Sequence, residues 1–150
     1  MAVQPIPDEH HVVRHSKKRE TIRENGQIIG VYPQTFFLRG ANPPLRPEPE
    51  KYLSCNYYEH FAGTALEKMK SCCEALAFQP KPVDAMVRLN VGLVKDCFKK
   101  HTVPVRVTHE PKQHSPSYSA IRPGKIDDAI AGLLATVAVV QLVTVADALA

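Results

Sequence analysis

The sequence predicts an α+β fold: a single domain with a small, mainly antiparallel sheet and about three helices, of which the C-terminal one is apolar. Short runs with apolar residues at alternate positions, typical of strands with one buried face, lie between runs with helical spacing. Thirteen prolines, clustered near the N-terminus and at residues 43–49 and 111–123, divide the chain into short elements. A chain of 150 residues fits one domain. The strand order stays open.

Composition narrows the class of protein further. The hydrophobic and charged fractions of 44% and 23% are those of a globular domain, and the net charge of +4 is too small for a dedicated DNA-binding protein. The four cysteines show no C-x-x-C spacing, so we expect reduced thiols rather than disulfides or a zinc site. The polar, proline-rich first residues differ from a signal peptide, so we expect a cytoplasmic protein.

The N-terminal half reads as an arm followed by strands. We expect a flexible arm over residues 1–10 and one α+β domain over residues 11–150. His11 to His15 predict a strand, in which His11 and His15 share the polar face of an edge strand. Asn25-Gly26 predicts a type I′ turn, because both central residues of that turn need positive φ. The turn would join a hairpin of residues 20–24 and 27–32.

The middle of the chain contains a proline-rich loop and a helix start. Residues 35–39 predict a strand, and residues 40–50 are too rich in proline for regular structure. We expect a helical turn around residues 56–60. Thr64 and Glu67 form a capping box that begins a helix over residues 65–78. Its buried face would comprise Leu66, Met69, Cys73 and Leu76.

A strand–helix–strand unit follows. We expect a strand at residues 85–91, a turn at Gly92, a helix at 93–100 and a strand at 103–108, where valines alternate with other residues. The helix is short for a parallel crossover, so both relative orientations of the strands stay open.

The C-terminal segment is the most ambiguous part of the sequence. Eighteen uncharged residues, 129–146, reach the length of a membrane span. Their alanines and polar residues favour instead a helix from about Asp127 to Val137, with either helix or strand over 137–146. We therefore expect no membrane association, with a C-terminal anchor at 129–146 as the alternative, and a homo-oligomer through this apolar segment as a further option.

Several blocks of the chain resemble a group of small bacterial proteins that has no established activity. The blocks are HVVR, YLSCNYYEHF, RLNVG and THEPKQHSPSYSAI, within about residues 11–135. The group carries an HVVR-type start, an LSVNWLEYF-type segment, NVG before a helix, and an H-x-P…NP-x-H-A-x-I segment. This resemblance implies a cytoplasmic domain. Where the group has the second histidine of its last block, this chain has Tyr118, and the nearest histidine is His114.

Residues 109–119 form the segment that most resembles a catalytic loop. His109 follows a strand, lies beside Glu110, and precedes Ser117 and Tyr118 in a loop that prolines stiffen. In an enzyme, His109 would be the general base, Glu110 would orient it, and Ser117 or Tyr118 would assist. The common nucleotide-binding and hydrolase motifs are missing from the sequence. Whether the protein is an enzyme stays open.

A binding face is the other interpretation. Aromatic and basic side chains suited to contacting a protein or a nucleic acid are Arg14, Arg39, Tyr57, Tyr58, His60 and His114. No ligand spacing for a metal stands out, and we expect no cofactor.

Two hypotheses follow. The first is a binding module of a bacterial multi-gene system, with an unknown protein partner or a nucleic acid; the alternative is a small hydrolytic or nucleolytic enzyme that uses His109 as general base. An enzyme predicts that His109, Glu110 and a serine or tyrosine converge in one concave pocket. A binding module predicts that they are dispersed, with an exposed apolar or basic patch elsewhere.

Overall fold

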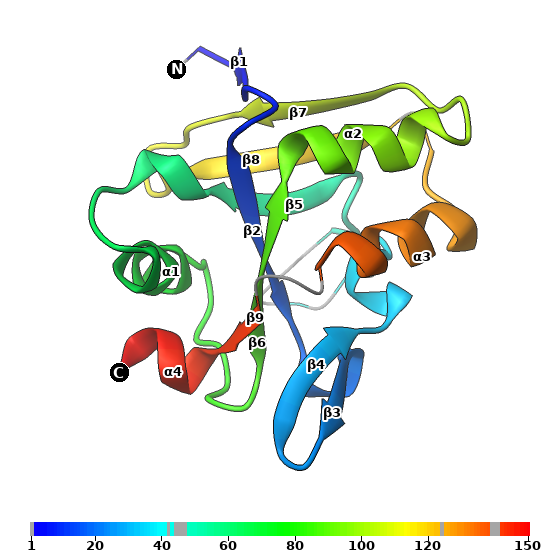
Figure 1. Ribbon diagram of the computed structural model, residues 1–150. Coiled ribbons are helices and arrows are strands. Elements are labelled where there is room, and N and C mark those ends of the chain that lie inside the picture. The colour runs from blue at the N-terminus through cyan, green and yellow to red at the C-terminus, as the bar shows by residue number, and fades with distance from the viewer. Residues whose placement is uncertain (1, 42, 44–47, 124, 139–141) are drawn as a thin grey trace.

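The computed structural model describes residues 2–41, 43, 48–123, 125–138 and 142–150 and confirms the α+β class (Figure 1). Within these ranges the regular elements, in chain order, are β1 (Gln4–Pro5), β2 (His11–Ser16), β3 (Thr21–Glu24), β4 (Gln27–Val31), β5 (Leu53–Tyr57), α1 (Ala65–Glu74), β6 (Ala85–Asn90), α2 (Val91–Lys99), β7 (Val105–His109), β8 (Tyr118–Pro123), α3 (Asp128–Val137), β9 (Leu142–Thr144) and α4 (Val145–Leu149). Short 3-10 helices are η1 (Lys18–Glu20), η2 (Pro33–Phe36) and η3 (Tyr58–His60).

The described strands form a seven-stranded antiparallel sheet and a separate hairpin. The order in the sheet is β1-β7-β8-β5-β2-β6-β9. Strand β2 lies between β5 and β6 and pairs with both, so the expectation that it is an edge strand is wrong. A central strand is covered on both faces, which is why Arg14 and His15 are buried together with the valines beside them.

Helices cover the two faces of the sheet unequally. Figure 1 shows α2 and α3 on one side of the sheet and α1 and α4 on the other. Val12 packs with the core under α2 and α3, and its neighbour Val13 packs with the core under α1 and α4. This alternation follows from the pleat of a strand, because successive side chains point to opposite faces. The second core is smaller and leaves part of that face open.

The hairpin prediction is confirmed. β3 and β4 pair with Glu24 opposite Gln27. Asn25 and Gly26 have φ values of 52° and 77°, as a type I′ turn requires.

The N-terminal segment, expected as a flexible arm, lies against the sheet. β1 pairs with β7, and Ile6 is buried. The carbonyl of Asp8 accepts a hydrogen bond from the Gly92 amide at 2.9 Å. A Cβ at Gly92 would lie 3.2 Å from that same carbonyl, so glycine permits this close approach.

The predicted strand at residues 35–39 is wrong. Pro33 begins η2 instead, because its fixed φ and missing amide suit the first turn of a helix. Residues 42 and 44–47 of the predicted loop lie outside the described residues.

Three helix predictions needed correction. The turn expected at 56–60 is strand up to Tyr57 and helical only in η3. The capping box of Thr64 and Glu67 begins α1 as predicted, but α1 ends at Glu74 rather than at residue 78. Leu66 is exposed, and Cys72 occupies the buried face in its place. Helix α2 begins at Val91, because the Asn90 side chain caps it by accepting a hydrogen bond from the Leu93 amide.

The strand–helix–strand unit exists, but its strands are not neighbours. Three strands separate β6 from β7, and every pair between them is antiparallel. β6 and β7 therefore run in the same direction, and α2 connects them across the face of the sheet.

The C-terminal segment is part of the domain. Its described residues form α3, β9 and α4, whose buried side chains include Ile130, Leu134, Val145 and Ala148. Residues 142–144 are strand, and residues 139–141 lie outside the described part. None of the helices in the described ranges combines the length and apolar character that a membrane crossing requires. Of the apolar side chains in this segment, Leu134 and Val145 are buried within the chain itself, whereas Leu149 is exposed.

Candidate functional site

A cavity of about 850 Å³ opens on the less covered face of the sheet. Its lining comes from β2, β5 and Tyr118 of β8, from residues 74–78 at the end of α1, and from the loops at 48–52 and 112–115. Cavities of this volume hold a small ligand or part of a larger one. Apolar surface, to which Val13, Leu76 and Phe78 contribute, makes up the larger part of the lining, and polar groups make up the smaller part.

His15 and Asp84 form a buried pair at this cavity. The Nε2 atom of His15 lies 2.8 Å from Oδ2 of Asp84, and His15 lines the cavity. Burial opposes ionisation of Asp84, but hydrogen bonds from His15 and from the amides of Lys81 and Lys18 lower its pKa. Burial, aided by the positive charge of Arg39, lowers the pKa of His15. At neutral pH Asp84 is therefore a carboxylate and His15 a neutral ring.

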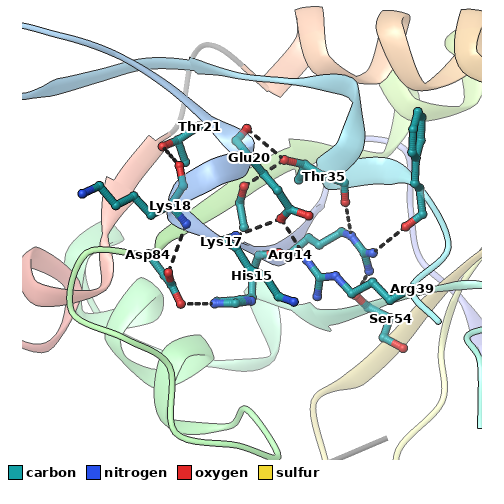
Figure 2. A network of polar contacts seen from close by, with 12 residues as sticks. Arg14, His15, Lys17, Lys18, Glu20, Thr21, Thr35, Arg39, Ser54 and Asp84 are labelled. Atoms are coloured by element: carbon teal, nitrogen blue, oxygen red, sulfur yellow. Dashed lines mark hydrogen bonds and ion pairs between the residues drawn. The ribbon is translucent and has the colours of Figure 1, made fainter. Parts of the chain in front are cut away.

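Arg14 organises the polar network beside this pair (Figure 2). Arg14 is 1% exposed, and its side chain donates to the carbonyls of Thr35 at 2.7 Å and of Ser54 at 2.9 Å. Glu50 accepts from both terminal nitrogens of Arg14, at 3.1 and 3.4 Å, and from the amide of Arg39. Burial opposes ionisation of Glu50, yet the charge and hydrogen bonds of Arg14 lower its pKa. The network fixes the loop at residue 50 against β2 and β5.

Hydroxyl groups converge at the opposite wall of the cavity. Tyr118 donates to the Tyr52 hydroxyl at 3.0 Å and lies 3.0 Å from Oγ of Ser54. Burial raises the pKa of the Tyr118 hydroxyl, so it stays protonated. Cations cover both rings: the Lys112 ammonium lies 3.7 Å from the Tyr118 centroid, and the Arg122 guanidinium 3.9 Å from that of Tyr52.

The proposed catalytic residues do not gather at this cavity. His109 Nε2 donates to the carbonyl of Pro116 at 2.7 Å, and Ser117 is buried with its hydroxyl donating to Asn56 at 2.8 Å. Of the four, Tyr118 alone lines the cavity.

Glu110 does not orient His109 either. Its carboxylate accepts two hydrogen bonds from Arg122, at 2.5 and 2.6 Å, and one from Thr108. The hydrogen bond from Arg122 is the main cause of the lowered pKa of Glu110. The arrangement therefore does not place a base beside a nucleophile at residues 109–118.

The proposed binding residues divide among three places. Arg39 and His114 line the cavity, whereas Arg14 is buried within the network. Tyr58 is buried beneath α1, with the Arg88 guanidinium 4.6 Å from its ring centroid. Both side chains are therefore closed to a partner.

Tyr57 and His60 join His109 in a row of rings that also includes His10. The centroid distances are 5.7 Å from His10 to Tyr57, 5.1 Å from Tyr57 to His109 and 5.5 Å from His109 to His60. The Nδ1 atom of His10 is hydrogen-bonded to the Tyr57 hydroxyl. Tyr57 packs against the core under α2 and α3, so this row lies away from the cavity.

Sequence reasoning missed the His15–Asp84 pair. The available signal was a strand, HVVRHS, in which Arg14 and His15 directly follow two valines. If such a strand is central, its polar side chains need buried partners.

The cavity offers binding groups rather than an activated nucleophile. Burial raises the pKa of the Cys55 thiol to about 12, so this cavity-lining cysteine is unreactive. Within the described ranges, no three His, Cys, Asp or Glu side chains are arranged to hold a metal ion.

No protein-family model, curated protein or solved structure matches this chain. The resemblance to small bacterial proteins therefore stays a prediction from the sequence.

Proposed function

We propose that this chain is a binding domain and that the cavity takes a short segment of a protein partner. The observation that carries the proposal is a cavity of about 850 Å³ in which polar side chains, held by internal hydrogen bonds, lie among apolar surface. Such preorganised groups bind without a further cost of ordering.

The charges of the cavity favour a protein segment over a nucleic acid. Lys17, Lys51 and Lys112 line it together with Glu48 and Glu74. A nucleic acid would bring its phosphates close to these two carboxylates, whereas a peptide presents groups of either sign. The apolar wall at Phe78 and Leu76 likewise suits a side chain of a peptide.

Exposed apolar and basic side chains near a second hollow support a binding role. The hollow, of about 740 Å³, is lined by Tyr32, Phe37 and Leu38, which are all exposed, and by Lys17 and Arg19. Lys17 also lines the first cavity, so the two hollows adjoin. A continuous partner surface could cover both.

The hydrolytic alternative has less support. It requires His109 beside Ser117 or Tyr118, and His109 is instead bonded to a backbone carbonyl. We keep the expectations of a bacterial source and a cytoplasmic location as part of the proposal. The four cysteines are free and buried, which supports a reducing compartment.

The test combines selected peptides with a blocked cavity. Peptides are selected on the whole chain by phage display and titrated into ¹⁵N-labelled protein, with a single-stranded oligo-uridine as the nucleic-acid probe. Ala77→Trp places a large ring at the cavity from an exposed position, and Ala62→Trp is the matched control at an exposed position outside the cavity lining.

We expect a peptide to shift the amide signals of Ser54, Lys112 and Tyr118 and to bind about tenfold more weakly to Ala77→Trp, but not to Ala62→Trp. An equal affinity of the peptide for Ala77→Trp and for the unaltered chain would contradict the proposal. Shifts of these amide signals caused by the oligo-uridine, but by none of the peptides, would also contradict it.

A further inference from the structure

The second hollow gathers exposed apolar side chains. Tyr32, Phe37 and Leu38 line it and are 47%, 36% and 40% exposed. They are three of the nine large apolar side chains that stay exposed within the described ranges. Single exposed apolar residues are ordinary on a protein surface, whereas a group of them that lines one hollow indicates an interaction site.

Backbone hydrogen bonds hold this apolar group in place. The amide of Tyr32 donates to the Glu20 carbonyl at 2.7 Å, which ties the start of η2 to the end of η1. The guanidinium of the buried Arg14 donates to the Phe37 carbonyl at 3.4 Å. Because the backbone is fixed before a partner arrives, little further ordering is needed on binding.

The hollow also carries positive charge. Lys17 and Arg19 line it, and among the described residues neither forms a salt bridge. Glu20 is the acidic residue of the described lining, and it is mostly buried. Its carboxylate accepts from the Lys17 amide at 2.9 Å and from the Arg39 guanidinium at 3.5 Å (Figure 2). The charge of Glu20 is therefore offset, and the charges of the Lys17 and Arg19 side chains attract anions.

Shape and composition select the class of anion. Leu38 is aliphatic and gives a nucleic-acid base no ring on which to stack. The apolar side chains line a hollow, whereas binding to a lipid surface uses an apolar face that enters the bilayer. Aromatic residues and arginine are enriched where proteins bind proteins. An acidic protein segment with an apolar side chain fits both the charge and the shape.

We propose that the second hollow binds an acidic stretch of the partner segment. A leucine or aromatic side chain of that stretch packs against Phe37 and Leu38. Carboxylates next to it pair with Lys17 and Arg19. This inference rests on the proposed function, because Lys17 lines both the cavity and the second hollow and the same segment continues from one into the other.

Two capped peptides of equal size test the proposed charge. Glu-Asp-Leu-Phe-Asp-Glu carries the carboxylates, and Gln-Asn-Leu-Phe-Asn-Gln replaces each of them by an uncharged amide. Each peptide is titrated into ¹⁵N-labelled whole chain, and the amide signals of Arg19, Phe37 and Leu38 are followed by NMR. A single-stranded oligo-uridine, titrated in the same way, is the nucleic-acid probe, and co-sedimentation with phosphatidylserine vesicles is the membrane probe.

We expect the acidic peptide to shift these signals and to bind about tenfold more tightly than its uncharged relative. The difference should shrink in about 0.5 M NaCl, where exposed charges are screened.

Matched variants locate the contact. Arg19→Gln and Leu38→Ser should each weaken binding of the acidic peptide about threefold. Arg106→Gln and Leu149→Ser, at exposed positions outside the lining, should bind it as the unaltered chain does. All four side chains are exposed, so we expect every variant to fold, and a thermal melt checks this.

Equal binding of the two peptides would overturn the inference, as would an acidic peptide that shifts none of the three signals. An affinity unchanged in both Arg19→Gln and Leu38→Ser would overturn it too. Shifts caused by the oligo-uridine, or co-sedimentation with the vesicles, without binding of the acidic peptide would assign the hollow to another class of partner. The proposed function is judged separately, because its signals are those of Ser54 and Tyr118 at the cavity.

Discussion

The role of Arg14 in the structure differs from the role that its sequence position suggests. In the sequence it is a basic residue available for a partner, and in the structure its charge is enclosed by Glu50 and three backbone carbonyls. A buried charge whose partner is removed costs far more than a surface charge does.

The change Arg14→Met tests this role. It leaves Glu50 buried without its ion-pair partner, so we expect the free energy of unfolding to fall by about 3–5 kcal/mol. Urea denaturation measures this free energy. The double variant Arg14→Met with Glu50→Gln should recover part of the loss, and the exposed Arg106→Met should change little. A loss below about 1 kcal/mol in Arg14→Met would contradict the enclosed network.

His15 gives stability a dependence on pH. Its pKa in the folded chain lies below the unfolded value of about 6.5. Just below that pH the unfolded chain therefore binds more protons, so stability is present above about pH 6.5 and is lost as the pH falls. Asp84, whose pKa is also lowered, adds a loss in the same direction at more acidic pH, below about 4.

We therefore expect the urea midpoint to fall between about pH 7.5 and 5.5, and to fall less in His15→Gln, whose amide can still donate to Asp84. The exposed His101→Gln should retain the full decrease. An equal decrease in His15→Gln and in the unaltered chain would show that His15 is not the group responsible.

At the scale of elements, local sequence and backbone conformation agree in the hairpin and in α3. Gly26 has φ +77°, Gly132 lies within α3, and a Cβ at either position would meet nothing within 4 Å. The same substitution at the two sites therefore reports on backbone conformation alone.

We expect Gly26→Ala to destabilise by about 1 kcal/mol, because alanine disfavours positive φ. Gly132→Ala should stabilise by about 1 kcal/mol, because alanine is the better helix former. Thermal unfolding followed by circular dichroism measures both. Changes of the same sign at the two positions would contradict the assigned conformations.

The core is built from segments far apart in the chain. α3 packs with α2, and α4 packs with α1. The segment after residue 125 thus contributes buried side chains to both cores, among them Leu134 and Val145.

A chain that ends at Lys125 should consequently lose its cooperative unfolding transition, because both cores would be opened to water. A chain that ends at Ala148, which removes only exposed residues, is the control. Size-exclusion chromatography with light scattering and a thermal melt detect the difference. A folded, cooperative Lys125 truncation would show that the C-terminal segment is dispensable for the domain.

The amino-acid sequence is enough to predict the fold class and the features that depend on a few neighbouring residues. The Asn25-Gly26 turn and the capping box of Thr64 and Glu67 are of this kind, because positive φ and a hydrogen bond to an amide three residues away are local properties. The strand at residues 35–39 was mispredicted because Pro33 favours a helical turn there.

Which polar residues are enclosed, and where the cavity lies, depends on contacts between distant parts of the chain. Arg14 meets Glu50 across 36 residues and His15 meets Asp84 across 69, distances in sequence over which no local pattern operates. Placing β2 between β5 and β6 buries both side chains and brings His15 to the cavity. The physical reason is burial, because a polar side chain removed from water requires a partner and the fold alone supplies it.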